Sequence, residues 1–133
     1  MAYWILIGAA LLGALAVGLG AFGAHALQGV LGEREQGWYD ISVTYQTNHA
    51  LAMALCGIFS IVAANFPTSR NACMWINTAG ACFILGIFVF SGSLYTMAFT
   101  GIAKLGMITP VGGLLLIIGW LCLAMGAFKL SSV

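Results

Sequence analysis

The sequence of 133 residues is 62% hydrophobic, and only 5% of its residues are charged. A soluble globular domain has about a quarter charged residues, so this composition excludes one. The net charge of +1 and the absence of a basic cluster argue against nucleic acid as a partner. The composition therefore indicates a single membrane domain over residues 1–133, with the lipid bilayer as its surroundings.

The few charged side chains divide the sequence into four uncharged runs. These runs cover residues 1–32, 41–69, 71–103 and 105–128, and each is longer than the roughly 20 apolar residues that span a bilayer. In lipid every backbone amide must be hydrogen-bonded within the protein, which favours helices. The sequence therefore predicts an all-α integral membrane protein, a four-helix up-and-down bundle.

The first predicted helix covers about residues 3–27, and the second covers about residues 41–65. Residues 28–40 hold all three acidic side chains, and we predict a polar loop there. In that loop Trp38 and Tyr39 are placed to contact lipid headgroups, as in an aromatic belt. Asp40 is suited to cap the second helix, because its carboxylate accepts hydrogen bonds from the free N–H groups of a first turn.

The third predicted helix covers about residues 72–99, after a turn at Pro67, and the fourth covers about residues 109–129. Gly101 is expected to break the third helix. Pro110 is typical of a helix start, because proline is favoured at the first helical position.

Small residues at regular spacing predict where the helices pack closely. Gly112, Gly119 and Gly126 are seven residues apart in the fourth helix, which is the repeat of a left-handed helix crossing. In the first helix Gly18 lies on a face of small residues that leads to His25. We expect all four glycines at contacts between helices.

Polar side chains are expected to gather in the outer third of the bundle, on the side of the first loop. Polar groups in a membrane are costly unless they are paired, so we expect them to face inward. We also expect the rings of His25 and His49 to lie close together at one depth. The predicted cluster comprises His25, Tyr45, Gln46, His49, Ser91, Ser93, Tyr95 and Thr109.

Some of these residue types can bind a metal or a cofactor. His25, His49, Met53 and Cys56 are the candidate metal ligands, because imidazole, thioether and thiolate suit copper, and two imidazoles suit haem. One alternative is thus a redox protein that binds copper, haem or a quinone through the two histidines. Membrane helix seams gather the same residue types for packing and hydrogen bonding, and we favour that interpretation and a protein without a cofactor.

The sequence gives little support for a catalytic function. No Asp or Glu lies within a predicted span, and general acid-base catalysis usually depends on such a group, so the sequence predicts no catalytic residue. A second alternative is a minimal small-molecule transporter, but the spans lack the charges and the repeated broken helices typical of one. We favour a non-enzymatic structural or interaction protein that binds another membrane protein or forms a homo-oligomer.

Four short segments carry a family resemblance. In their order and spacing they make the chain similar to the domain of unknown function 423 family, the YgdD-like small inner-membrane proteins of bacteria. The resemblance covers nearly the whole chain, implies a four-span bundle in the plasma membrane, and supplies no catalytic residue. The segments are Gly20-Ala21-Phe22-Gly23-Ala24-His25, Tyr45-Gln46-x-x-His49-Ala50-Leu51, Phe90-Ser91-Gly92-Ser93-Leu94-Tyr95 and Thr109-Pro110-Val111-Gly112-Gly113.

The orientation in the membrane depends on the basic residues outside the spans. Four spans place both termini on one side, together with Arg70 and Lys129, while Arg34 and Lys104 lie on the other side. This balance makes the positive-inside rule indecisive. Members of the family are more basic on the side of the termini, so the resemblance implies that both termini are cytoplasmic.

Overall fold

The structure, a computed structural model, describes residues 1–65 and 70–131. The chain forms α1 (Ala2–His25), α2 (Glu33–Ala63), α3 (Arg70–Thr100) and α4 (Thr109–Ser131), with a short 3-10 helix, η1 (Ala103–Met107), before α4. The described residues contain no strand, and α1, α2, α3 and the segment from η1 to α4 are each long and apolar enough to cross a membrane. The all-α membrane fold is thus confirmed. Pro67, where a turn was predicted, lies outside the described residues.

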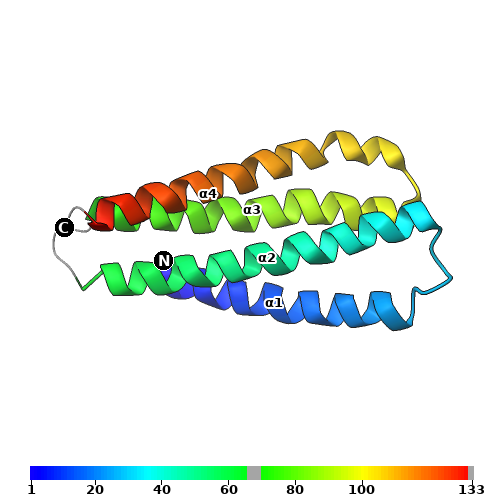
Figure 1. Ribbon diagram of the computed structural model, residues 1–133, viewed down its shortest axis with the longest axis horizontal. Helices are drawn as coiled ribbons and strands as arrows, with labels where there is room; N and C mark the ends of the chain where they lie inside the picture. The colour runs from blue at the N-terminus through cyan, green and yellow to red at the C-terminus, as the bar shows by residue number, and fades with distance from the viewer. Residues whose placement is uncertain (66–69, 132–133) are drawn as a thin grey trace.

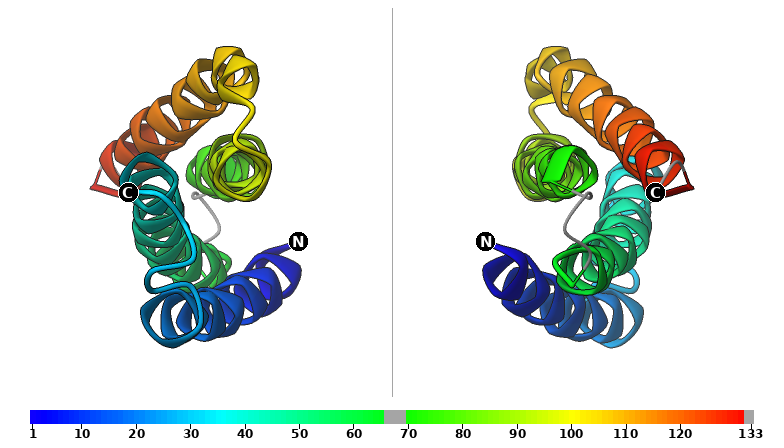
Figure 2. Two further views of the ribbon diagram at one scale, coloured as in Figure 1. Left: turned by 90° about the vertical axis from the view of Figure 1, so that its right-hand side faces the viewer. Right: turned by 90° about the vertical axis from the view of Figure 1, so that its left-hand side faces the viewer.

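The helices run up and down in chain order, so that the start of α1 and the end of α4 lie at the same end of the molecule (Figure 1). Viewed along the long axis, α2 and α3 lie between α1 and α4 (Figure 2). Most contacts follow the chain order, so that α1 packs on α2, α2 on α3, and α3 on α4. Contacts between α2 and α4 are few, and α1 and α4 have none among the described residues. The bundle is therefore open between α2 and α4.

Two glycines make the turns at the end opposite the termini. Gly29 has φ +75° and Gly101 has φ +70°, a left-handed backbone that only glycine adopts at little cost. Gly101 directly follows the last residue of α3, and its backbone N–H donates to the carbonyl of Met97 at 2.8 Å. This geometry ends α3 where the sequence predicted a break.

The start of α2 corrects the sequence prediction. The helix begins at Glu33 and not near residue 41, so most of the expected loop over residues 28–40 is helical. Glu33 and Glu35 occupy its first turn, where carboxylates stabilise the positive end of the helix dipole. Further along, the amide of Gln36 donates to the carboxylate of Asp40 at 2.8 Å, so Asp40 is an ordinary helical residue and not the cap.

The longer α2 also moves Tyr39 out of the expected aromatic belt. Its side chain is 1% exposed, and its hydroxyl donates to the carbonyl of Leu19 in α1 at 2.6 Å. The ring lies directly against Gly23, where a Cβ would come within 2.5 Å of it. Tyr39 therefore holds α1 and α2 together instead of contacting headgroups.

Three glycines of α4 form its contact with α3. A Cβ on Gly112 would collide with the backbone of Phe90, and a Cβ on Gly119 would come within 2.6 Å of the Phe83 ring. Gly126 meets α3 in the same way, and all three glycines are buried. The heptad spacing thus does mark a close helix contact.

The expectation for Gly18 is wrong. Gly18 is exposed, and an added Cβ would meet no atom within 4 Å. The neighbouring small residues Ala14 and Ala21 are exposed as well. The small-residue face of α1 points out of the molecule because α1 contacts α2 through a different side, which includes Gly20 and Gly23.

Two opposite faces of α2 matter for function. The inner face is buried and comprises Tyr39, Ser42, Gln46, His49, Met53, Cys56 and Ser60. Each residue of the outer face follows an inner residue by two positions, which is about 200° around a helix. The outer face is exposed and comprises Ile41, Thr44, Asn48, Leu51, Leu55, Ile58 and Val62.

Candidate functional site

Gln46 lies on the inner face of α2 and links three helices. Its side-chain N–H donates to the carbonyl of Leu12 in α1 at 2.9 Å, and its side-chain oxygen accepts from the hydroxyl of Tyr95 in α3 at 3.0 Å. Gln46 is only 2% exposed, so an unpaired amide there would be costly. The two bonds satisfy both ends of the amide and fix α1 and α3 to α2.

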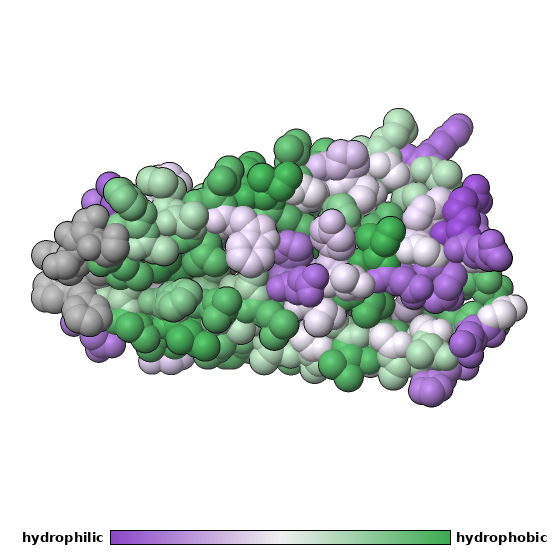
Figure 3. Space-filling view, viewed as in Figure 1, coloured by the Kyte–Doolittle hydropathy of each residue, from purple (hydrophilic) through white to green (hydrophobic). Residues whose placement is uncertain are grey.

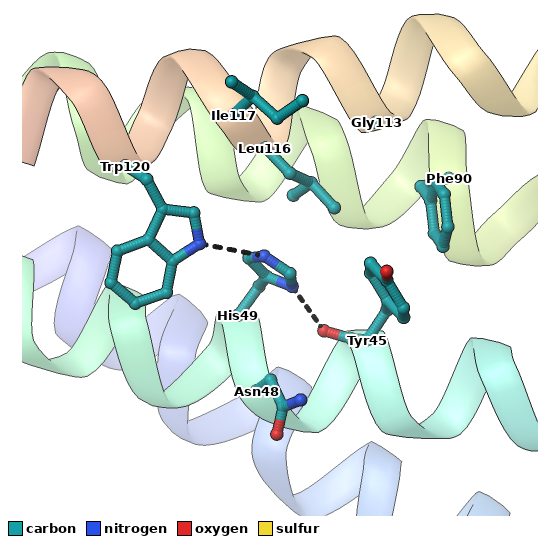
Figure 4. A pocket seen from close by; sticks show the side chains of 8 residues that line it. All are labelled: Tyr45, Asn48, His49, Phe90, Gly113, Leu116, Ile117 and Trp120. Carbon is teal, nitrogen blue, oxygen red and sulfur yellow. Dashed lines mark hydrogen bonds between the residues drawn. The ribbon is translucent and has the colours of Figure 1, made fainter.

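His49 forms the equivalent link to α4 (Figure 4). The indole N–H of Trp120 donates to Nε2 of His49 at 3.2 Å, and Nδ1 lies 2.8 Å from the carbonyl oxygen of Tyr45. Since an indole N–H can only donate, Nε2 must accept, and Nδ1 then carries the proton that bonds Tyr45. His49 is therefore a neutral ring with both nitrogens engaged.

A lateral groove opens beside His49, between α2 and α4 (Figure 4). Its volume is ≈ 470 Å³, and its walls include the rings of Tyr45 and Phe90, which stack with centroids 4.4 Å apart. On the face of the molecule seen in Figure 3, hydrophilic residues (purple) lie at mid-length as well as at the end opposite the termini. The groove thus joins aromatic rings to a polar region at mid-length. Its lining comprises Tyr45, Asn48, His49, Phe90, Gly113, Leu116, Ile117 and Trp120.

The hydroxyl groups of the predicted cluster form separate links. Ser93 of α3 and Thr109 of α4 share a hydrogen bond of 2.8 Å near the connection between these helices. Ser42 donates to the carbonyl of Ser91 at 3.3 Å, while the buried hydroxyl of Ser91 has no partner among the described residues. Apart from His25, the predicted residues are therefore divided among four links, centred on Gln46, His49, Ser91 and Ser93, and do not form one cluster.

His25 does not join any of these links. It is the last residue of α1 and is exposed. Gln46 meets α1 at Leu12, and a helix rises about 20 Å from Leu12 to His25 at 1.5 Å per residue. The prediction that His25 and His49 lie close together is therefore wrong. Because α2 begins at Glu33, His49 lies near the middle of this helix and not in the outer third of the bundle.

The proposed metal ligands are not assembled into a site. Met53 and Cys56 are fully buried in the apolar core, and both ring nitrogens of His49 are already hydrogen-bonded. In the described ranges no group of three or more His, Cys, Asp or Glu side chains is placed to hold a metal ion. The geometry gives these residues packing and hydrogen-bonding roles.

Two polar side chains at mid-length of α2 make no hydrogen bond within the described part of the chain, the hydroxyl of Tyr45 in the groove and the amide of Asn48. Asn48 is exposed on the outer face of α2. Figure 4 shows its side chain turned away from the bond between His49 and Trp120. The hydroxyl of Thr44, one turn earlier, already donates to the carbonyl of Asp40 at 2.8 Å. Asn48 therefore presents an unpaired amide to whatever surrounds the helix.

Sequence reasoning missed Trp120, although a signal was present. Tryptophan in membrane proteins is enriched at the two interfaces, whereas Trp120 lies in the middle of α4. An indole N–H at that depth needs an acceptor, and a histidine in another span is a suitable one. The depth of Trp120 could thus have identified it as the partner of His49.

Comparison with known proteins finds similar membrane proteins. Residues 19–113 match the family described as protein of unknown function (DUF423). A UPF0382 membrane protein of Staphylococcus aureus is 43% identical over 131 residues, which cover 98% of this chain and 99% of that protein. The UPF0382 inner membrane protein YgdD of Escherichia coli is 35% identical over 128 residues, which cover 96% and 92%. No solved structure is detectably similar.

Proposed function

Since this chain belongs to the DUF423 family of membrane proteins of unknown function, we propose a role from its geometry: a non-enzymatic interaction protein that binds a transmembrane helix of another protein molecule. The binding surface is the outer face of α2. The observation that carries this proposal is the unpaired, exposed amide of Asn48 in the middle of an apolar helix.

The inner polar residues support this role because they are hydrogen-bonded to one another. Tyr95 bonds Gln46, Trp120 bonds His49, and Thr109 bonds Ser93, so the polar atoms of each pair hold two helices together. Such links fix the helices to one another, and among the described residues they leave no acid, base or nucleophile positioned for a reaction. The groups free to act on another molecule therefore lie on the outside.

The chemistry of Asn48 favours a helix as its partner. Lipid chains offer an amide no hydrogen bond, so an exposed Asn at this depth is costly when the protein is alone. A second helix that packs on the outer face can supply a polar side chain, and interhelical hydrogen bonds of this type promote association in membranes. The apolar residues around Asn48, such as Leu51 and Leu55, would pack against the same helix.

Photocrosslinking in the membrane of living cells tests the proposal. A photoreactive amino acid at Leu51, one turn after Asn48 on the outer face, should form a protein adduct of defined mass. Leu114 of α4 is the matched control, because the exposed fractions of the two leucines are 63% and 59%. We expect little adduct from position 114, and we expect Asn48→Leu to reduce the adduct from position 51.

Equal adducts from the two positions would show that the outer face of α2 has no preference for a partner. If Asn48→Leu left the adduct from position 51 unchanged, Asn48 would not contribute to binding the partner helix. Either outcome overturns the proposal.

The aromatic groove favours a second candidate function, the binding of a planar apolar ring such as a quinone. Its volume of ≈ 470 Å³ lies within the roughly 300 to 1,000 Å³ of ligand sites. Gly113→Leu would fill the groove, whereas Gly18→Leu on the open face of α1 would not. A short-chain benzoquinone should then bind the wild type and Gly18→Leu saturably but not Gly113→Leu. Failure of the wild type to bind would exclude this candidate.

We also propose that the protein lies in the plasma membrane with both termini in the cytoplasm. The end that holds the termini carries Arg70 and Lys129 and no acidic residue. At the opposite end Arg34 is paired with Glu35 at 2.7 Å, which offsets part of its positive charge. The opposite end also holds Lys104, so two basic residues at the end with the termini stand against one there outside the ion pair, a small excess that favours the cytoplasmic side for the termini.

A further inference from the structure

The outer face of α2 has the residue spacing of a coiled-coil seam. Its members recur at alternating steps of three and four residues from Ile41 to Val62, and all of them are exposed. Helices with this repeat wrap around each other with a left-handed crossing. Five of the seven residues are Ile, Leu or Val, as such a seam requires. The face is therefore suited to pack against one parallel or antiparallel helix.

Asn48 restricts which partner helix can pack on the outer face of α2. A side-chain amide both donates and accepts, so it can pair with an identical amide. A single Asn in an otherwise apolar seam is the residue that sets register and oligomer state in coiled coils. Between Ile41 and Val62 the helix carries no charged residue that would repel an identical surface. The outer face is thus complementary to itself.

The membrane makes this self-complementarity geometrically simple. Two copies inserted with the same topology are related by a two-fold axis along the membrane normal, so their α2 helices run parallel. Residues of equal number then lie at equal depth, and the two Asn48 side chains face each other at the axis. An interface of this type is closed and pairs the same patch of both subunits.

The size of the face is adequate for a dimer. Its large apolar residues are all exposed, Ile41 the least at 44% and Leu51 the most at 63%. Together with Tyr45 and Phe59 on its flanks, the face offers on the order of 600 Å² per copy, against roughly 800 Å² per partner in a standard interface. In the described part of the chain no other helix exposes an unpaired polar side chain at mid-length. On α1, for example, no polar side chain lies between Trp4 and His25.

From these observations we infer that the partner is a second copy of this chain, bound through α2 against α2 with the two Asn48 amides paired at the two-fold axis. The inference rests on the proposed function, because it names the partner of the same face. It assigns the groove beside His49 to the edge of the dimer interface, since Tyr45 and Asn48 belong to both surfaces.

Cysteine crosslinking in native membranes tests the inference. Leu51→Cys and Leu55→Cys place a thiol on the seam, and Leu11→Cys in α1 and Leu114→Cys in α4 are controls with similar exposure. Under a mild oxidant, the two seam variants should form a disulfide-linked species of twice the chain mass of 13.9 kDa. Wild type, which has four free cysteines, should give none. Coexpression of two differently tagged copies should give a mixed product.

The role of Asn48 has its own readout. With fluorescent donor and acceptor labels at the amino terminus, where Met1 is exposed, energy transfer in vesicles reports dimer dissociation. Asn48→Leu should weaken the dimer about tenfold, and Asn48→Gln, which keeps the amide, should weaken it less. Helix content by circular dichroism should be unchanged in both variants, because the side chain is exposed.

The outcomes separate this inference from the proposed function. Seam adducts with a different protein but not with a second copy would overturn the inference and leave the proposed function standing. No seam adduct of any kind would overturn both. Dimers that crosslink equally through position 11 or 114, or that Asn48→Leu does not weaken, would place the interface elsewhere and overturn the inference.

Discussion

Trp120 of α4 donates its indole N–H to Nε2 of His49 of α2 over 3.2 Å, and this bond joins two helices that contact each other at few positions. Both residues lie near the middle of their helices, far from the connecting turns. The bond therefore bridges the groove between α2 and α4, where backbone packing contributes little. It also determines the tautomer of His49, because Nε2 must be the accepting nitrogen.

Trp120→Phe should destabilise the bundle by about 1 kcal/mol, because it removes this interhelical bond while keeping an aromatic ring. Equilibrium unfolding in mixed detergent micelles, followed by circular dichroism, measures the change. Trp4→Phe is the control, since Trp4 is exposed near the start of α1. Equal stability of the two variants would mean that the bond does not contribute to folding.

His49→Gln should be tolerated better than His49→Leu, by about 1 kcal/mol in the free energy of unfolding. The side-chain oxygen of Gln can still accept from Trp120, whereas Leu leaves the indole N–H unpaired. The same unfolding assay compares the two variants. If His49 served as a ligand, both substitutions would instead abolish a bound metal, haem or quinone equally, which elemental analysis and visible spectra of the purified proteins would reveal.

Gln46 and Tyr95 should be energetically coupled. Tyr95→Phe removes the hydroxyl that donates to the Gln46 side chain at 3.0 Å, and Gln46→Leu removes the acceptor. A double-mutant cycle should give a coupling of about 0.6 to 2 kcal/mol, the range for hydrogen bonds between membrane helices. The pair of Tyr95→Phe with His49→Gln is the control and should be closer to additive. A coupling near zero for Gln46 and Tyr95 would contradict the bond.

Gly112→Ala should cost about 1 to 3 kcal/mol, because its Cβ would collide with the backbone of Phe90, which cannot rotate away as a side chain can. Gly18→Ala is the matched control on α1, where an added Cβ meets no atom within 4 Å. It should be neutral or stabilising, since alanine is the better helix former. Thermal unfolding in detergent should rank the two variants in this order, and the reverse order would exclude a close contact at Gly112.

The sequence predicts the number of helices and the contact of α4 for simple physical reasons. A span must be long and uncharged, and a close contact needs glycines on one face, so Gly112, Gly119 and Gly126 could be assigned by spacing. Gly18 shows the limit of that reasoning. Its face has similar spacing, but which side of α1 turns inward is decided by partners such as Tyr39, which spacing in α1 does not reveal.

The error at the start of α2 explains most of what was mistaken about the candidate site. Acidic residues suggested a loop, yet Glu33 and Glu35 stabilise the first turn of a helix. The inner face of α2 in fact continues without a break from His49 back to Tyr39, a periodicity that favours a helix over a loop. Once α2 begins at Glu33, His49 moves to mid-length and His25 can no longer reach it.

The proposed orientation predicts which exposed positions an impermeant maleimide can label in intact spheroplasts. Gln28→Cys lies in the connection between α1 and α2 and should be labelled, because the proposal places this end outside the cell. Lys129→Cys, at the other end of the bundle, should be labelled only after the membrane is permeabilised. Both residues are exposed, so burial in the protein does not limit either reaction.

Leu51→Cys is the internal control for this labelling, because it lies at mid-length on α2 and should react poorly under both conditions. Wild type reports any background from the native cysteines, of which Cys56 and Cys122 are buried. Labelling of Lys129→Cys but not of Gln28→Cys in intact spheroplasts would invert the orientation. Labelling of both before permeabilisation would require an odd number of spans and contradict the four-span architecture itself.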